Sequence, residues 1–249
     1  MISGGTYYCC RVVRLRPVRP AGWWPDALLV AGFVALTLAV AAGAFLGWDV
    51  SVYRWCDGHL PRPLYWVARA GFLLGQSWLV TWPALVVSLV VAWRRRSVRP
   101  VLPVAVAFVL TFVTLTALKA WTDRAAPHAT LAHPERFGSG GVSYPSGHLT
   151  NAIVWYGVLA LLLAPWLPAG WRLLVRVGPP AVLCVTSVYL GFHWVTDTVA
   201  GLLLGLLLDR VLRRIPWDEV PLGRRLHGTG WDRPAVEQPL EPVAAAHHP

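Results

Sequence analysis

The chain has 249 residues, of which 56% are hydrophobic and only 14% are charged. This balance is typical of a membrane protein and excludes an ordinary soluble domain. The formal charge of +10 would suit a nucleic-acid-binding protein, but the arginines cluster between apolar runs. That distribution favours topology signals and contacts with anionic lipids.

Six apolar runs are long enough to cross a bilayer, because a spanning helix needs about 18 or more such residues. In chain order they cover 27–47, 72–93, 100–118, 149–167, 174–192 and 195–212. Many of the 15 tryptophans lie near the ends of these runs, as in interfacial aromatic belts. The sequence therefore predicts an all-α, polytopic membrane protein with a bundle of six transmembrane helices.

The arginine-rich segments predict the orientation of this bundle. They precede the first run and follow the second, fourth and sixth, so all of them fall on one side. The positive-inside rule makes that side cytoplasmic and places both termini there. We expect three parts: a basic cytoplasmic segment at 1–26, a membrane domain at 27–215 and a disordered cytoplasmic tail at 216–249. The first run is expected to remain as an uncleaved span.

Four ionisable residues are expected to meet at the outer face. Lys119 ends the third run, His148 begins the fourth, His193 ends the fifth and Asp197 lies in the first turn of the sixth. Ionisable groups at one membrane depth are functional candidates. Lys119 is also the only lysine of the chain.

Two short motifs give these residues a chemistry. Pro145-Ser146-Gly147-His148 starts an apolar helix, so backbone N–H groups there are free to bind an anion. His193 and Asp197 are four residues apart, so one helix face would carry both, and the carboxylate would hold the imidazole in one tautomer. A phosphate cradle, a general acid and a carboxylate-backed histidine indicate phosphoryl transfer at a membrane surface.

Over residues 72–212 the chain resembles the type 2 phosphatidic acid phosphatase family, which shares its site with vanadium haloperoxidases. The resemblance implies a metal-independent and cofactor-free hydrolase. In it, His193 is the nucleophile, Asp197 orients it and His148 is the general acid. Lys119 and the backbone of Ser146 and Gly147 would bind the phosphate.

The chain departs from the family motifs at two positions where the family has phosphate-binding arginines. They are Ala126 and Ser187 here. Losing one preorganised donor typically costs about 10²–10³ in rate. Arg124 is predicted to replace part of the missing charge, with Arg136 in the 119–147 loop as the second candidate. His128, His133 and Glu135 in this loop match no metal motif and are expected to be solvated.

The expected function is hydrolysis of a lipid-linked phosphate or diphosphate, such as a prenyl (di)phosphate or a phospholipid phosphate. It would proceed through a phosphohistidine at the extracytoplasmic face of the cell membrane. The expected partners are the lipid substrate and the bilayer, and no nucleic acid; the oligomeric state is left open. Two alternatives remain at this point: a degenerate member that only binds lipid phosphate, and a phosphotransferase using the same phosphohistidine.

Overall fold

The computed structural model describes residues 19–222 and 231, and within them all regular structure is helical. The α-helices are α1 (Trp24–Ala41), α2 (Leu46–Gly58), α3 (Arg62–Phe72), α4 (Ser77–Arg95), α5 (Leu102–Thr122), α6 (Gly147–Leu162), α7 (Ala169–Tyr189) and α8 (Val195–Arg214). Short 3₁₀ turns are η1 (Leu73–Gly75), η2 (Arg99–Val101) and η3 (Trp217–Glu219). The predicted all-α class is confirmed.

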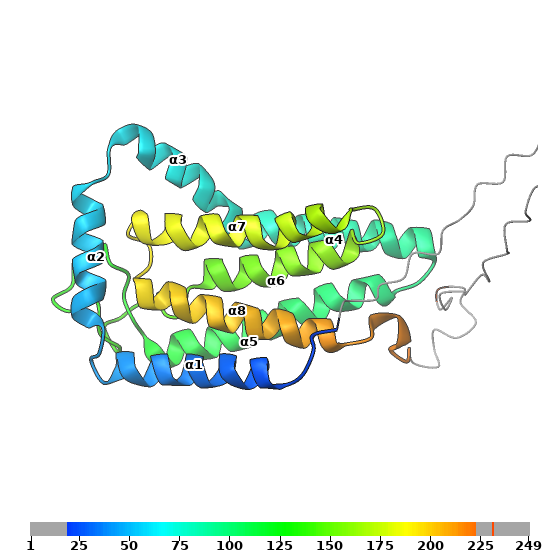
Figure 1. Cartoon of the computed structure of the whole chain (residues 1–249), viewed down its shortest axis with the longest axis horizontal. Helices are drawn as coiled ribbons and strands as arrows, with labels where there is room; N and C mark the ends of the chain where they lie inside the picture. Colours follow the sequence, from blue (N-terminus) through cyan, green and yellow to red (C-terminus); the bar gives the residue numbers. More distant parts are fainter. Residues whose placement is uncertain (1–18, 223–230, 232–249) are drawn as a thin grey trace, which may run out of the picture.

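The long helices run along one axis, with α2 lying across one end of the bundle and α3 slanting back toward α7 (Figure 1). Helix α6 is central, because it contacts α4, α5, α7 and α8. Apolar side chains lie on all sides of α6, and its residues Leu149, Trp155 and Leu162 are almost completely buried. A helix that is apolar all round is stable only when it is enclosed in this way.

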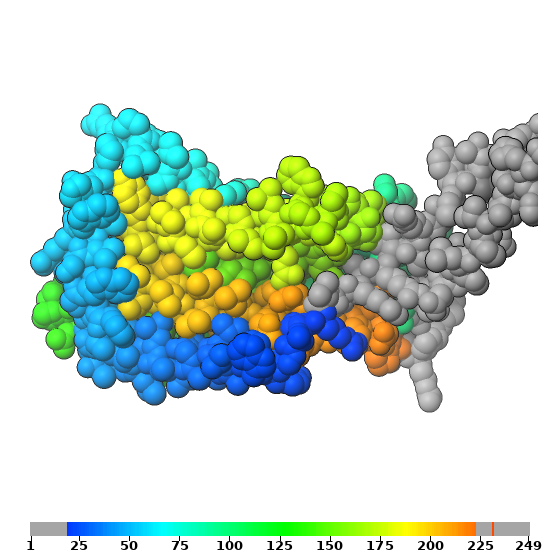
Figure 2. Space-filling model, in the orientation of Figure 1, coloured from blue at the N-terminus to red at the C-terminus, as the bar shows by residue number. Residues whose placement is uncertain are grey.

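The outer helices are built to face lipid. Four segments are long and apolar enough to span a membrane: α1, α4, η2 with α5, and α7. They expose large apolar side chains such as Phe108, Phe112 and Val185, as expected where the solvent is hydrocarbon. Figure 2 shows one lateral face, on which α7 and α8 lie between α1 and α3. The protein is thus a multi-pass membrane protein.

Each of the six predicted runs contains one long helix, but two of these helices differ from a simple span. Helix α6 has only 16 residues, and α8 carries Asp197, Asp209 and Arg210. Both are the inner helices of the bundle, where protein rather than lipid satisfies polar groups. The count of six spans therefore stays a prediction.

Helices α6 and α8 pack closely because α8 has small residues at their contact. A Cβ atom on Gly201 would lie 2.7 Å from the backbone oxygen of Ser146, which no side chain tolerates. Gly201 and Gly205 form the small-xxx-small spacing that lets membrane helices approach. This contact fixes the start of α6 against the first turns of α8.

The end of the bundle opposite α2 is held by ion pairs. Asp26 near the start of α1 pairs with Arg210 and Arg214 of α8, and Arg176 of α7 pairs with Asp209 at 2.5 Å. The arginine-rich segments of the described residues therefore meet at one end of the molecule, as the sequence predicted (Figure 1).

The packed domain extends beyond the predicted boundary at residue 215. Trp217 is only 1% exposed and belongs to the main hydrophobic core, so the prediction of disorder from Pro216 onward is wrong for this turn. Arg95 also pairs with Asp218 at 3.2 Å. The remainder of the predicted tail, apart from 220–222 and Trp231, and residues 1–18 of the predicted N-terminal segment lie outside the described residues.

Candidate active site

Two histidines face each other at the end of the bundle that α2 covers. His148 is the second residue of α6, and His193 lies in the turn between α7 and α8. Their ring centroids are 5.8 Å apart, and His193 is 6% exposed. Asp197 lies beside them in the first turn of α8 and is fully buried. The structure thus brings together three of the residues singled out from sequence.

A serine mediates the contact between His193 and Asp197. The nearest Nδ1–Oδ2 distance is 3.7 Å, too long for a hydrogen bond. Ser143 Oγ lies between them, donates to Asp197 and is 3.2 Å from His193 Nδ1. Since the serine proton goes to the carboxylate, Nδ1–H must donate to Ser143. In the neutral ring the Nε2 lone pair is then free, which is the state a nucleophilic imidazole requires. The sequence motif gave no sign of Ser143.

Arg124 requires a correction, because its guanidinium is fully buried behind Asp197. It contacts Asp197 at 2.6 Å and Asp49 at 2.8 Å, and Nε donates to the backbone oxygen of Glu135. It also donates to Thr196 at 2.7 Å. With these donors engaged, Arg124 is in no position to bind substrate phosphate. It instead holds the Asp197 carboxylate, which accepts a hydrogen bond from Ser143, and Ser143 contacts His193.

Asp49 completes this arrangement and was not identified from sequence as a site residue. It lies near the start of α2, is 1% exposed and accepts from Arg124 and from both the backbone N–H and the hydroxyl of Thr196. Its partners are 75 and 147 residues away in sequence. Asp49 therefore ties α2 to the start of α8 and to Arg124.

The start of α6 forms the predicted anion cradle only in part. Ser146 is the N-cap: its hydroxyl accepts from Leu149 N–H at 3.4 Å, and its own N–H donates to the backbone oxygen of Asp197 at 3.0 Å. The predicted phosphate contact through Ser146 N–H is therefore not available. The N–H groups of Gly147 and His148 are in the first helical turn, where no intrahelical acceptor exists. They are free to bind an anion.

Lys119 lies beside this cradle. Its ammonium donates to the backbone oxygen of Val142 and is 3.6 Å from the position a Cβ would take on Gly147. The absence of a side chain on Gly147 thus leaves room for the lysine next to the helix start. The predicted neighbourhood of Lys119 and His148 is therefore present.

The loop that carries Ser143 is anchored to α1 through Tyr144. Thr37 donates to Phe33 O, so the Tyr144 hydroxyl must donate to Thr37, at 2.6 Å. Burial raises the pKa of Tyr144 to about 12, so the phenol stays neutral at any physiological pH. The Tyr144 hydroxyl therefore keeps the proton that it donates to Thr37.

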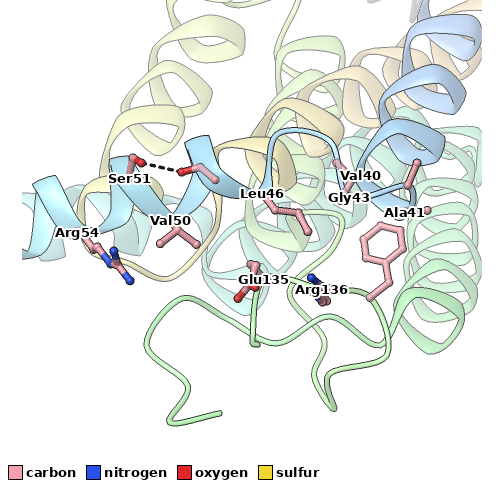
Figure 3. A pocket seen from close by; sticks show the side chains of 12 residues that line it. Val40, Ala41, Gly43, Leu46, Val50, Ser51, Arg54, Glu135 and Arg136 are labelled. Carbon is pink, nitrogen blue, oxygen red and sulfur yellow. Dashed lines mark hydrogen bonds between the residues drawn. The ribbon is translucent and has the colours of Figure 1, made fainter. Parts of the chain in front are cut away.

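Arg136, the second candidate for the missing charge, lies at a separate cavity. This cavity of about 620 Å³ lies between the end of α1, α2 and residues 135–137 (Figure 3). Arg54 and Glu135 also line it, whereas neither His148 nor His193 does. The structure thus places Arg136 away from the site.

These features define a helical membrane protein with two histidines and a lysine gathered at a helix N-terminus. Residues 100–221 match the family model of the PAP2 superfamily. It is 42% identical over 97 residues to phosphatidylglycerophosphatase B of Bacillus subtilis (strain 168), a match that covers 36% of this chain. The match spans 45% of that relative, which is less than half of its length.

A solved structure has the same fold. It is the crystal structure of a transmembrane PAP2-type phosphatidylglycerolphosphate phosphatase from Bacillus subtilis, with a TM-score of 0.65 and 24% sequence identity. The superposition covers 76% of this chain and 94% of the other. The bundle therefore shares the fold of that structure.

Proposed function

We propose that this protein is a membrane lipid phosphatase that hydrolyses the phosphate of a lipid headgroup through a phosphohistidine on His193. The observation that carries the proposal is the orientation of His193: Nδ1 is held by Ser143, which itself donates to Asp197, while His148 faces the ring with its centroid 5.8 Å away. An imidazole fixed in this tautomer acts as a nucleophile. The match of residues 100–221 to the PAP2 superfamily and the similarity to the named Bacillus relative support the same activity.

The reaction has two steps. First, His193 Nε2 attacks phosphorus, the N–P bond forms and the P–O bond to the lipid breaks, while His148 gives its proton to the leaving alkoxide. In the second step His148 removes a proton from water, the water oxygen attacks phosphorus and the N–P bond breaks. Lys119 and the N–H groups of Gly147 and His148 bind the phosphoryl oxygens and stabilise their charge.

The substrate we propose is a phospholipid phosphate such as phosphatidylglycerophosphate, with prenyl phosphates and diphosphates as the alternative. The test is phosphate release by the detergent-purified protein from each lipid, in the presence of a chelator. His193→Ala should abolish release, whereas His133→Ala, in an exposed side chain of the 119–147 loop, should not. Release that survives in His193→Ala would refute the proposal.

The vacant arginine positions favour a second candidate, a protein that binds lipid phosphate without turnover. Ala126 and Ser187 lack the charge-assisted contacts that stabilise a phosphoryl group. In that case no lipid would release phosphate, while binding of lipid phosphate would persist. A phosphotransferase would instead move the group from His193 to an added acceptor lipid, which product analysis with and without the acceptor distinguishes.

We further propose that the site faces the extracytoplasmic side, because the arginine-rich end of the bundle lies opposite it. Ala132→Cys, on the site side, should react with an impermeant thiol reagent in intact cells. Gly170→Cys, in the first turn of α7 at the arginine-rich end, should react only after permeabilisation. The reverse labelling pattern would refute this orientation.

A further inference from the structure

Helix α3 packs against α7 (Figure 1), and the η1 turn that follows it contacts both α6 and α7. Its Phe72 is 3% exposed, and the ring centroid lies 4.5 Å from that of His148 and 4.7 Å from that of Phe192. Three residues further on, a Cβ on Gly75 would lie 2.7 Å from the side chain of Leu183 and 3.2 Å from His148 Cβ, so the η1 turn packs tightly against both residues. The end of α3 thus forms part of the wall around His148.

Arg69 lies one turn before Phe72 on the same helix. Its guanidinium carbon is 5.0 Å from the centroid of Phe192, the residue that precedes His193. The side chain is half-buried, and no aspartate or glutamate among residues 19–222 forms an ion pair with it. By contrast, Arg124, Arg176 and Arg210 each have a carboxylate partner. Arg69 therefore brings an uncompensated positive charge to the edge of the histidine site.

The histidine site lacks the two arginines expected at positions 126 and 187, and Arg69 carries the same guanidinium group. Arg124 is committed to Asp49 and Asp197, and Arg136 lies at a different cavity. Ser187 is fully buried in α7, and a Cβ on Gly71 of α3 would be 3.3 Å from the neighbouring Thr186. Helix α3 thus packs against the part of α7 that contains Ser187, where the family motif has an arginine. The same helix carries the guanidinium of Arg69.

We propose that Arg69 binds the phosphoryl oxygens of the substrate at His193. A guanidinium presents paired donors that match a phosphate bidentately, and stacking on an aromatic face holds its plane in place. With Lys119 reaching the cradle from α5, two cations from separate helices then face a terminal, dianionic phosphate. This inference rests on the proposed function, since it assigns a ligand for that same substrate.

The test compares Arg69→Ala with Arg62→Ala, which removes an exposed arginine from the first turn of the same helix. Binding of dodecyl phosphate is measured by calorimetry in detergent, with both changes made in a His193→Ala background so that no turnover occurs. We expect Arg69→Ala to weaken binding about 10- to 100-fold, the range of a charge-assisted contact. Arg62→Ala should leave it unchanged. Arg69→Lys, which keeps the charge but loses the fork, should give an intermediate affinity.

Equal affinities of Arg69→Ala and Arg62→Ala for dodecyl phosphate would overturn the assignment of Arg69. That result is distinct from failure of the proposed function, which is read from phosphate release by the protein with His193 intact. If release is absent but the affinity difference remains, Arg69 is still a phosphate ligand of a binding protein. If release depends on His193 and the affinities are equal, only the inference about Arg69 is wrong.

Discussion

Replacing Asp49 by asparagine tests whether α2 supports His193, the proposed nucleophile. The carboxylate is 1% exposed and accepts hydrogen bonds from Arg124 at 2.8 Å and from Thr196 N–H at 3.0 Å. Asparagine keeps the volume but removes the charge and turns an N–H₂ group toward these donors. Breaking one side of a buried ion pair costs about 3–5 kcal/mol. In a chain of this size each kcal/mol corresponds to about 2–4 °C in melting temperature.

We therefore expect Asp49→Asn to lower the unfolding temperature in detergent by roughly 6–20 °C. The effect on activity should be separate from this loss, because Arg124 also fixes Asp197, and Asp197 acts on His193 through Ser143. A displacement of about 1 Å in such a chain costs on the order of 10² in rate. The kcat, measured well below the unfolding temperature, should fall while the KM for the lipid changes little.

The matched control is Asp57→Asn, an exposed position on the same helix. Surface substitutions of this kind change stability by less than about 0.5 kcal/mol. The reasoning would be refuted if Asp49→Asn had the same melting temperature and the same kcat as Asp57→Asn. That result would mean that Arg124 and Asp197 keep their geometry without α2.

Three further predictions follow from individual contacts. Ser143→Ala removes the hydroxyl between His193 and Asp197 and should lower kcat about 10- to 100-fold at unchanged KM. A wild-type kcat would show that Ser143 does not connect Asp197 to His193. Gly201→Ala places a methyl group against the backbone of Ser146 and should destabilise the protein by about 1–3 kcal/mol, whereas Gly170→Ala, which has open space, should not. Phosphate release should be insensitive to a chelator, because the proposed nucleophile, acid and phosphate ligands all belong to this chain; loss of activity that returns with a divalent cation would refute this.

The residues that could be identified from the sequence are those that stand at recognisable positions of the apolar runs. The apolar runs located the six long helices, since hydrophobic length is fixed by the bilayer rather than by tertiary contacts. His148, His193 and Lys119 were found because each stands at the end of such a run. Where those ends meet follows from topology alone, so their approach in space needed no knowledge of packing.

The residues that sequence missed owe their role to contacts between distant segments. Asp49 reaches Thr196 across 147 positions, and Ser143 contacts Asp197 from a loop that contains several other polar residues. The prediction that Arg124 binds phosphate was wrong, because a loop position does not reveal which partners the side chain contacts. Trp217 likewise follows a proline after the last run, where only packing against the core shows that the fold continues.

The most direct test of the central claim is to trap the covalent intermediate. The purified protein is mixed with a lipid phosphate that carries radioactive phosphorus, and the reaction is quenched in alkali, which preserves an N–P bond. The protein is then digested, and the labelled peptides are identified by mass spectrometry. The account predicts phosphate on the peptide containing His193, no label in His193→Ala, and wild-type labelling in His133→Ala. Label on another residue, or steady phosphate release by His193→Ala, would contradict it.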